Sequence, residues 1–294
     1  MITSHKVETV YHAAAYKHIP LLERNIIAAV ENNTLATAKL ARIAQECNVE
    51  RMVLISSDKA VRPANIKGAS NRLQEMILQG MAQKSGSRTI FTAVRFGNVL
   101  DSSGSVVPRF REQIKSGGPL TITHPEIIRY FMSIPEAAEL VIQAGAMAKN
   151  GELYVLDMGE PVKIDDLARQ MIRLSGKEVA DADNPDGDIE LKYIGLRPGD
   201  KMHEELLIEG DLVGTTHPFI LRLNEAPALS VEDSAIMLEQ FETAVESEST
   251  REIQTLLAQY VEGYSPVYGD GPTSRRPEDC DLDVVAFPTS RSQK

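Results

Sequence analysis

The sequence predicts an α/β protein: a doubly wound parallel sheet with a smaller α/β lobe attached to it. Three apolar runs of strand length, at residues 7–13, 52–56 and 89–96, alternate with helical patterns, which is the rhythm of parallel sheets. A polar cluster follows the second of these runs directly, and ligands of open α/β sheets bind beyond the carboxyl ends of the strands. Shorter alternating segments then follow, which indicates the second lobe.

Bulk composition narrows the class of protein. The chain has 294 residues, of which 43% are hydrophobic and 25% charged, as in globular proteins with a sizeable core. The formal charge of -11 argues against a nucleic-acid partner, because phosphate binding needs a basic face. Two distant cysteines, Cys47 and Cys280, give neither a disulfide framework nor a zinc spacing, so no metal is expected. No apolar run reaches about 20 residues and Met1–Lys6 is no signal peptide, so we expect a cytoplasmic protein without a membrane span.

The first strand runs into a loop of three small residues, Ala13, Ala14 and Ala15. Such a loop lets the backbone approach a ligand, although a packing contact explains it equally well. Residues 21–47 are then helical in pattern, with a break around Asn32 and Asn33. Their apolar face of small residues can pack on the sheet or pair with a helix of a second subunit.

The second strand carries the most informative polar cluster. Its apolar run ends at Ser57, Asp58 and Lys59, which place a hydroxyl, an acid and a base side by side at the expected ligand edge of the sheet. The alternative is a polar turn with one charge pair. A turn signal follows at Arg62-Pro63, and a helix is predicted to open near Asn65.

The rest of the chain divides into further segments. We expect a partial sheet domain over 1–118, a mainly substrate-binding lobe interleaved with it over 119–228, an acidic helix or helix pair over 229–263 and a disordered tail over 264–294. Within the second half the predicted strands are 120–123, 152–158 and 189–194, and the predicted helices are 135–149 and 164–175.

One feature of dinucleotide-binding sheets is missing. These sheets open with a strand, a Gly-rich turn and a helix whose N-terminus holds the pyrophosphate, and nothing before Val7 can supply that unit. The sheet is therefore expected to lack its first βαβ units. The edge that this leaves exposed is an aggregation hazard, so poor solubility of the isolated chain is expected.

Several long runs carry a family resemblance. The chain resembles the nucleotide-sugar dehydratases of bacterial polysaccharide biosynthesis, extended short-chain dehydrogenases/reductases that act on UDP-N-acetylglucosamine as 4,6-dehydratases. The resemblance implies a truncated Rossmann-like fold. The matching runs are HAAAYKHIP (12–20), SSDKAVRPANIKGAS (56–70), AVRFGNVLDSSGSVVPRF (93–110), RYFMSIPEAA (129–138), VLDMGEPVKIDDLA (155–168) and LRPGDK (196–201).

The resemblance implies tightly held NAD and a role for each residue of the polar cluster. Hydride leaves sugar C4 for NAD, water is lost across C5 and C6, and hydride returns to C6. Ser57 would bond the C4 oxygen, Asp58 would protonate the leaving C6 hydroxyl, and Lys59 would remove the C5 proton. A lysine base needs a pKa lowered by burial or by neighbouring charge.

Further positions carry over from the family one at a time. The Ala13–Ala15 loop and Asn33 match the region along NAD, and Asn98 matches an asparagine near the nucleotide diphosphate. Arg129 and Arg197 match diphosphate-binding arginines, and Asp200 replaces a glutamate near the ribose. The expected partners are thus a UDP-N-acetyl sugar and, through helices 21–47 and 66–84, a second copy of the chain.

Two departures from the family concern cofactor and substrate. The superfamily places Tyr, or Met in one branch, four residues before a Lys that bonds the nicotinamide ribose; here these positions are Lys67 and Asn71. Lys67 lies one helical turn from Asn71, on the same side. Asp101 stands where relatives have Gly, and an acid there would repel a diphosphate.

Two hypotheses of different classes follow. The first is an NAD-dependent UDP-N-acetylglucosamine dehydratase, favoured by the intact Ser57, Asp58 and Lys59. The second is a non-catalytic UDP-sugar-binding remnant, or a fragment that needs a partner chain, favoured by the missing Gly-rich turn and by Asn71. A 4-epimerase is disfavoured, since that chemistry needs the absent Tyr.

Overall fold

The computed structural model describes residues 1–197, 199–204, 212–225 and 229–265. Its centre is a six-stranded sheet in the order β1-β2-β3-β8-β13-β12. The first four strands pair in parallel and the last two are antiparallel. The strands are β1 (Thr9–His12), β2 (Arg51–Ile55), β3 (Ile90–Arg95), β8 (Leu153–Leu156), β13 (Ile220–Leu223) and β12 (Leu212–Gly214).

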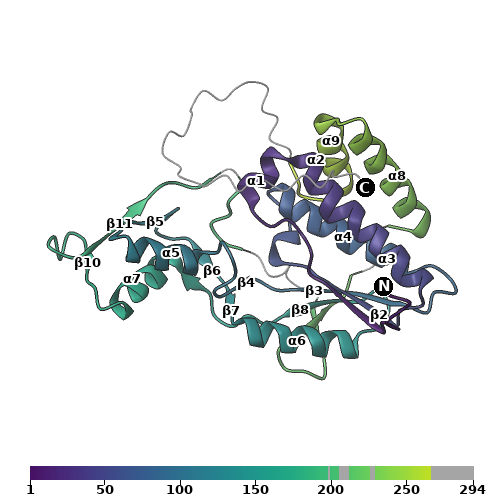
Figure 1. Cartoon of the computed structure of the whole chain (residues 1–294), viewed down its shortest axis with the longest axis horizontal. Helices are drawn as coiled ribbons and strands as arrows, with labels where there is room; N and C mark the ends of the chain where they lie inside the picture. Colours follow the sequence, from purple (N-terminus) through teal and green to yellow (C-terminus); the bar gives the residue numbers. More distant parts are fainter. Residues whose placement is uncertain (198, 205–211, 226–228, 266–294) are drawn as a thin grey trace.

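Helices cover both faces of this sheet (Figure 1). Alternate residues of β2 point to opposite faces, so Val53 packs toward α6 (Ile134–Met147) while Met52 and Leu54 pack toward the other helices. Those helices are α1 (Ile19–Arg24), α2 (Ile26–Ala29), the π-helical segment η1 (Val30–Leu35), α3 (Ala36–Glu46) and α4 (Ile66–Ala82). The predicted parallel, doubly wound α/β architecture is confirmed.

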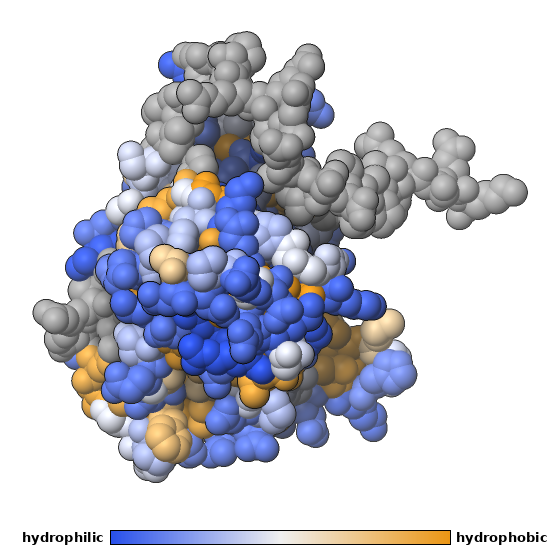
Figure 2. Space-filling view, turned by 90° about the vertical axis from the view of Figure 1, so that its left-hand side faces the viewer, coloured by the Kyte–Doolittle hydropathy of each residue, from blue (hydrophilic) through white to orange (hydrophobic). Residues whose placement is uncertain are grey.

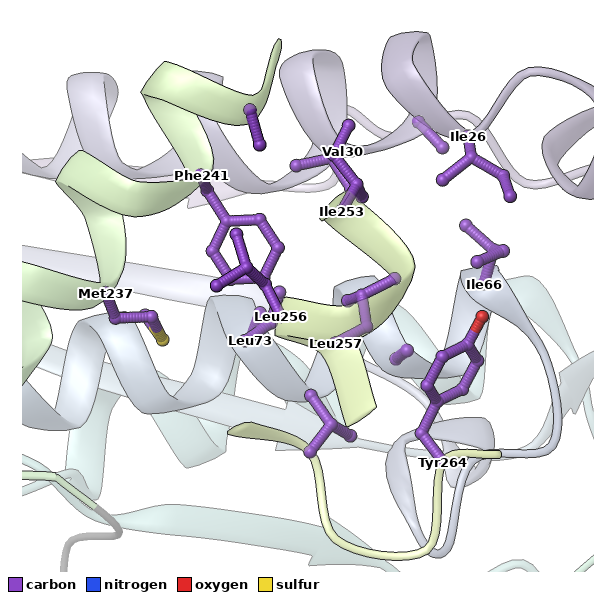
Figure 3. Close-up of a cluster of buried hydrophobic side chains, with 14 of the residues drawn as sticks. Ile26, Val30, Ile66, Leu73, Met237, Phe241, Ile253, Leu256, Leu257 and Tyr264 are labelled. Carbon is purple, nitrogen blue, oxygen red and sulfur yellow. The ribbon is translucent and has the colours of Figure 1, made fainter. Parts of the chain in front are cut away.

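A second helix layer covers α4. Helices α8 (Val231–Glu246) and α9 (Thr250–Tyr260) bury Phe241 and Leu257 against Leu73 of α4 and Val30 of η1 (Figure 3). The acidic segment is therefore a helix pair. The face of α4 that it covers is not open to a second subunit, and a homo-oligomer through the remaining surface of 21–47 stays a prediction.

The smaller lobe has its own sheet and core. Strands β10 (Val179–Ala180), β11 (Ile189–Tyr193) and β5 (Leu120–Ile122) pair in parallel in that order. Helices α5 (Val106–Lys115) and α7 (Ile164–Leu174) pack on it around Phe110 and Ile172. The outer face at this end is mostly hydrophilic, with hydrophobic residues scattered over it (Figure 2).

Two short ladders lie between the lobe and the main sheet (Figure 1). Strand β4 (Asn98–Val99) pairs in parallel with β7 (Phe131–Met132), and β6 (Ile128–Arg129) pairs antiparallel with β9 (Val162–Lys163). They carry Asn98 and Arg129 toward the end of β2, which is followed by a 3₁₀ turn, η2 (Asp58–Ala60).

The two parts of the chain are interleaved, and this exchange begins before residue 118. Helix α5, from the first 118 residues, packs in the lobe core, whereas β8 and α6, from the second half, pack with the main sheet. The chain thus crosses between the two parts more than once. The antiparallel strands β12 and β13 were not anticipated, because their short runs lack a clear alternation.

The break expected at Asn32 and Asn33 appears as the π-helical segment, with a further interruption at Asn25. Within the described residues β1 pairs with β2 alone and forms the sheet edge. The tail expected to be disordered lies almost wholly outside those residues. Among the helices that are described, none combines the length and apolarity needed to cross a membrane.

Candidate active site

The polar residues after β2 are fixed by the backbone of the neighbouring strand. The Ser56 amide donates to the Val94 carbonyl at 2.9 Å, and the Asp58 amide donates to the Phe96 carbonyl at 3.1 Å. Ser57 then caps the 3₁₀ turn, because its Oγ accepts from the Lys59 amide at 3.3 Å. The turn therefore presents Ser57, Asp58 and Lys59 at the carboxyl edge of the sheet, as the sequence predicts.

Lys59 lies between two carboxylates. Its Nζ donates to Asp58 Oδ1 at 2.9 Å, lies 3.6 Å from Glu204 Oε1 and reaches Asn98 Oδ1 at 3.5 Å. Asp58 and Glu204 are both buried. The second oxygens, Asp58 Oδ2 and Glu204 Oε2, are buried with no hydrogen-bond partner among the described residues. Two vacant acceptors at one ammonium are chemically unusual, since buried polar atoms normally have partners.

These carboxylates decide the charge of Lys59. Burial alone would lower the pKa of this amine, but the negative charges of Asp58 and Glu204 outweigh burial and raise it. The expectation that a base here needs a lowered pKa is therefore not met in this arrangement. Lys59 is an ammonium at neutral pH until its proton moves to a neighbour.

The departures on α4 have structural consequences. Asn65 caps the helix by accepting from the Gly68 amide at 2.9 Å. Asn71 is buried, and its Nδ2 donates to Ser57 Oγ at 2.9 Å. Together with the bond from the Lys59 amide, this fills both acceptor positions of the Ser57 hydroxyl and leaves its proton free to donate.

Lys67 sits in the first turn of α4, half-buried near the same cluster. Burial, first, and then the positive charges of Lys59 and Lys17 lower the pKa of Lys67 to about 8. It is thus the lysine of this site whose ammonium is destabilised. The cation that the family places at the position of Asn71 has no equivalent there, and Lys67 begins one turn earlier.

The residues expected along the cofactor divide into two kinds. The loop of Ala13, Ala14 and Ala15 is exposed. Asn33 is fully buried and anchors the end of that loop: its Oδ1 accepts from the Tyr16 amide at 2.7 Å and its Nδ2 donates to the Tyr16 carbonyl at 3.1 Å. Asn33 therefore shapes the loop and does not lie open to a ligand.

Arg129 is already engaged within the chain. Its guanidinium donates to the carbonyls of Ile128 at 2.7 Å, Lys201 at 2.8 Å and Met202 at 3.3 Å, and its Nε lies 3.6 Å from Glu204 Oε1. Arg129 thus fastens the segment 199–204 to β6. In this arrangement its clearest role is to hold Glu204 beside Lys59.

The same segment carries other expected substrate-binding residues. Asp200 Oδ2 accepts from the Arg197 backbone amide at 3.1 Å, which closes a tight turn. Asn65 Nδ2 donates to the Gly199 carbonyl at 3.0 Å, and Lys201 Nζ donates to the Val61 carbonyl at 3.0 Å. Residues 199–204, which include Asp200, therefore dock directly on the site, and Arg197 lies just before them in the chain.

A buried ionic network supports the site from beneath. Glu75 of α4 receives two bonds from Arg95 at the end of β3, at 2.7 and 2.6 Å, and one from Ser56 Oγ at 2.6 Å. Arg72 adds a bond at 3.2 Å. The network ties α4 to the ends of β2 and β3 and so fixes where Ser57 and Asp58 lie.

Sequence reasoning missed Glu204 and Glu75. Glu204 lies three residues after the LRPGDK run. The two adjacent glutamates at 204 and 205 were the sequence feature that could have indicated it. Glu75 reads as an ordinary polar helix residue, because its partners Arg95 and Ser56 are distant in sequence.

Comparisons with known proteins place the chain in a family. The family model described as polysaccharide biosynthesis protein (Polysacc_synt_2) matches residues 1–225. The capsular polysaccharide biosynthesis protein CapD of Staphylococcus aureus is 54% identical over 207 residues, covering 70% of this chain and 33% of its own. The chain thus spans about a third of the length of that relative.

Solved structures agree on the fold. Pen from Bacillus thuringiensis matches with a TM-score of 0.68 and 33% identity, over 78% of this chain and 69% of its own. DesIV from Streptomyces venezuelae, a dTDP-glucose 4,6-dehydratase with NAD bound, matches at a TM-score of 0.60 and 16% identity over 82% of this chain and 76% of its own, which shows the fold alone. Family model and relative together establish that the chain belongs to the Polysacc_synt_2 family of polysaccharide biosynthesis proteins.

Proposed function

We propose that this chain carries the substrate-binding and acid–base part of an NAD-dependent dehydratase that acts on UDP-N-acetylglucosamine. The observation that supports it most is the pairing of Asp58 and Lys59 at 2.9 Å beside the Ser57 hydroxyl, at the ligand edge of the sheet. An acid and a base in contact suit an elimination, in which one group gives a proton and its neighbour takes one.

Each residue has a defined task in this proposal. Ser57 donates a hydrogen bond to the C4 oxygen of the sugar, because both of its acceptor positions are filled by Asn71 and the Lys59 amide. Asp58, when protonated, gives its proton to the leaving C6 hydroxyl, and Lys59, when neutral, takes the proton from C5.

The bound NAD would take the hydride from C4 and return it at C6. The exposed Ala13–Ala15 loop leaves room for a ligand at the end of β1, and Lys67 supplies positive charge near the Ser57 hydroxyl. A Gly-rich turn that could hold the pyrophosphate is not among the residues of this chain near β1. These residues therefore fit the nicotinamide end, and the other end needs a further segment.

The second candidate function is a non-catalytic protein that binds a UDP-sugar or completes its site with a partner chain. Asn71 favours it, because an amide cannot supply the cation that the family uses on this helix. The exposed edge of β1 offers the backbone groups that such a partner strand would need.

A calorimetric titration with NAD, in the presence of UDP-N-acetylglucosamine, separates the two. Micromolar binding and turnover that Lys59→Ala abolishes would support the dehydratase. Sugar-nucleotide binding without NAD binding would support the second function. The double variant Lys67→Met/Asn71→Lys restores the family pattern on α4, so NAD binding by this variant alone would show that the cation at position 71 is what the chain lacks.

A further inference from the structure

Asp58 and Lys59 form a hydrogen bond in which Lys59 Nζ donates a proton to Asp58 Oδ1. The proposed elimination needs this proton on Asp58, so that the carboxylic acid can give it to the leaving hydroxyl while the neutral amine takes the C5 proton. After that step Asp58 is a carboxylate and Lys59 an ammonium, which is the ion pair seen here. The elimination step therefore balances with these two groups alone, provided that the proton first moves from Lys59 Nζ to Asp58 Oδ1.

Glu204 stands where it can control that move. Its Oε1 lies 3.6 Å from Lys59 Nζ on one side and 3.6 Å from Arg129 Nε on the other, and its side chain is 6% exposed. At this distance and burial, a negative charge favours the ammonium form of Lys59 strongly. Arg129 is itself immobilised by three backbone carbonyls, so Glu204 cannot easily turn away.

We propose that Glu204 is a positioning residue for the acid–base pair: its carboxylate, held by Arg129, keeps the shared proton on Lys59 and thereby sets the pH at which the pair can act. The use of this control in dehydration rests on the proposed function, whereas the control itself does not. Arg197 and Asp200, expected to contact the nucleotide, lie on the same stretch of chain, so a bound nucleotide sugar would act on the position of Glu204 directly.

Three other charged groups act on Lys59 besides Glu204: Asp58, Arg129 and Lys67. Asp58 raises the pKa of Lys59 as Glu204 does, whereas the positive charge of Arg129 lowers it. Lys67 on α4 is also close enough for its charge to act on this cluster. Without Glu204, one carboxylate faces two cations besides Lys59. The ammonium form of Lys59 then loses much of its electrostatic stabilisation.

The experiment follows the side-chain amine of Lys59 by NMR titration of the full chain with labelled lysine, with Lys59→Arg used to assign the signal. In Glu204→Gln the pKa of Lys59 should fall by at least about one pH unit. Glu204→Asp keeps a carboxylate at a longer distance, so its value should lie between the two. Glu126→Gln is the matched control, because it removes an exposed glutamate paired with Lys163 and should leave Lys59 unchanged.

The proposal would be overturned if the pKa of Lys59 did not change in Glu204→Gln. It would also be overturned if this pKa fell equally in Glu204→Asp and Glu204→Gln. If Glu204→Gln does not fold, the fall or constancy of the Lys59 pKa in Glu204→Asp decides. In the dehydration assay the rise of kcat/KM with pH should move to lower pH in Glu204→Gln. Absent turnover in every variant, combined with the expected NMR shift, would reject the proposed function and keep the role of Glu204.

Discussion

The two sides of helix α4 differ in the buried polar interactions that they carry. The side toward the sheet carries Glu75 in a buried network with Arg95 and Ser56. The side toward α8 and α9 carries Leu73 in an apolar cluster with Phe241 and Leu257. An apolar contact depends mainly on area and fit, whereas a buried ion pair fails when one partner is lost. The specific geometry of the site therefore comes from the polar network, whereas apolar contacts on both sides of α4, including those of Leu78 with Met52 and Leu54, stabilise the fold.

Glu75→Ala should give the largest effect, because it leaves the buried guanidinium of Arg95 without its bidentate partner. We expect a loss of about 3–5 kcal/mol in the free energy of unfolding, measured by urea denaturation. Loss of less than about 1 kcal/mol would mean that water replaces the carboxylate and that the two sides of α4 differ little.

Leu257→Ala tests the apolar side. Leu257 is fully buried in the cluster of α4, α8 and α9, so we expect a loss of about 2–4 kcal/mol by the same measurement. Its matched control is Ile236→Ala, since Ile236 lies on α8 but is 51% exposed and should cost about 0.5 kcal/mol or less. Glu75→Ala should also shift the NMR signal of the Lys59 side-chain amine, whereas Leu257→Ala should not. A shift of this signal in Leu257→Ala would contradict the separation of the two sides.

The smallest effect concerns Lys67, whose half-buried positive charge lowers the stability of the folded protein. Its pKa of about 8 in the fold lies below the ordinary value of 10.5, so the unfolded chain binds this proton more tightly. The stability of the protein relative to Lys67→Met should rise as pH increases from about 8 to about 10.5. At pH 7 Lys67→Met should be the more stable by about 1–2 kcal/mol, after allowance for solvent screening.

Thermal unfolding of both proteins between pH 6 and pH 10 measures this difference. Lys84→Met, at an exposed position just beyond α4, controls for the loss of one positive charge. A difference between the protein and Lys67→Met that stays constant with pH would show that Lys67 is not destabilised as an ammonium.

Local patterns in the sequence predicted much of the fold. The apolar runs gave the strands β1, β2 and β3, and Asn65 marked the start of α4, because strand periodicity and helix capping depend on neighbouring residues. The placement of Ser57, Asp58 and Lys59 at the sheet edge followed from the same rule of parallel strands. The antiparallel strands β12 and β13 were missed, because both runs are short and the strand that joins them to the main sheet, β8, lies more than 50 residues before β13.

The sequence by itself determined the family, the parallel sheet and the position of Ser57, Asp58 and Lys59 at its edge, since long ordered runs and local periodicity carry them. Only the tertiary structure decided the electrostatics of the site. Glu204 reaches Lys59 across 145 positions of the sequence, Arg129 turns out to hold that glutamate, and Asn71 bonds the Ser57 hydroxyl. Charge and hydrogen bonding act through space at a few ångströms, and no local pattern records which distant residues the fold brings to that distance.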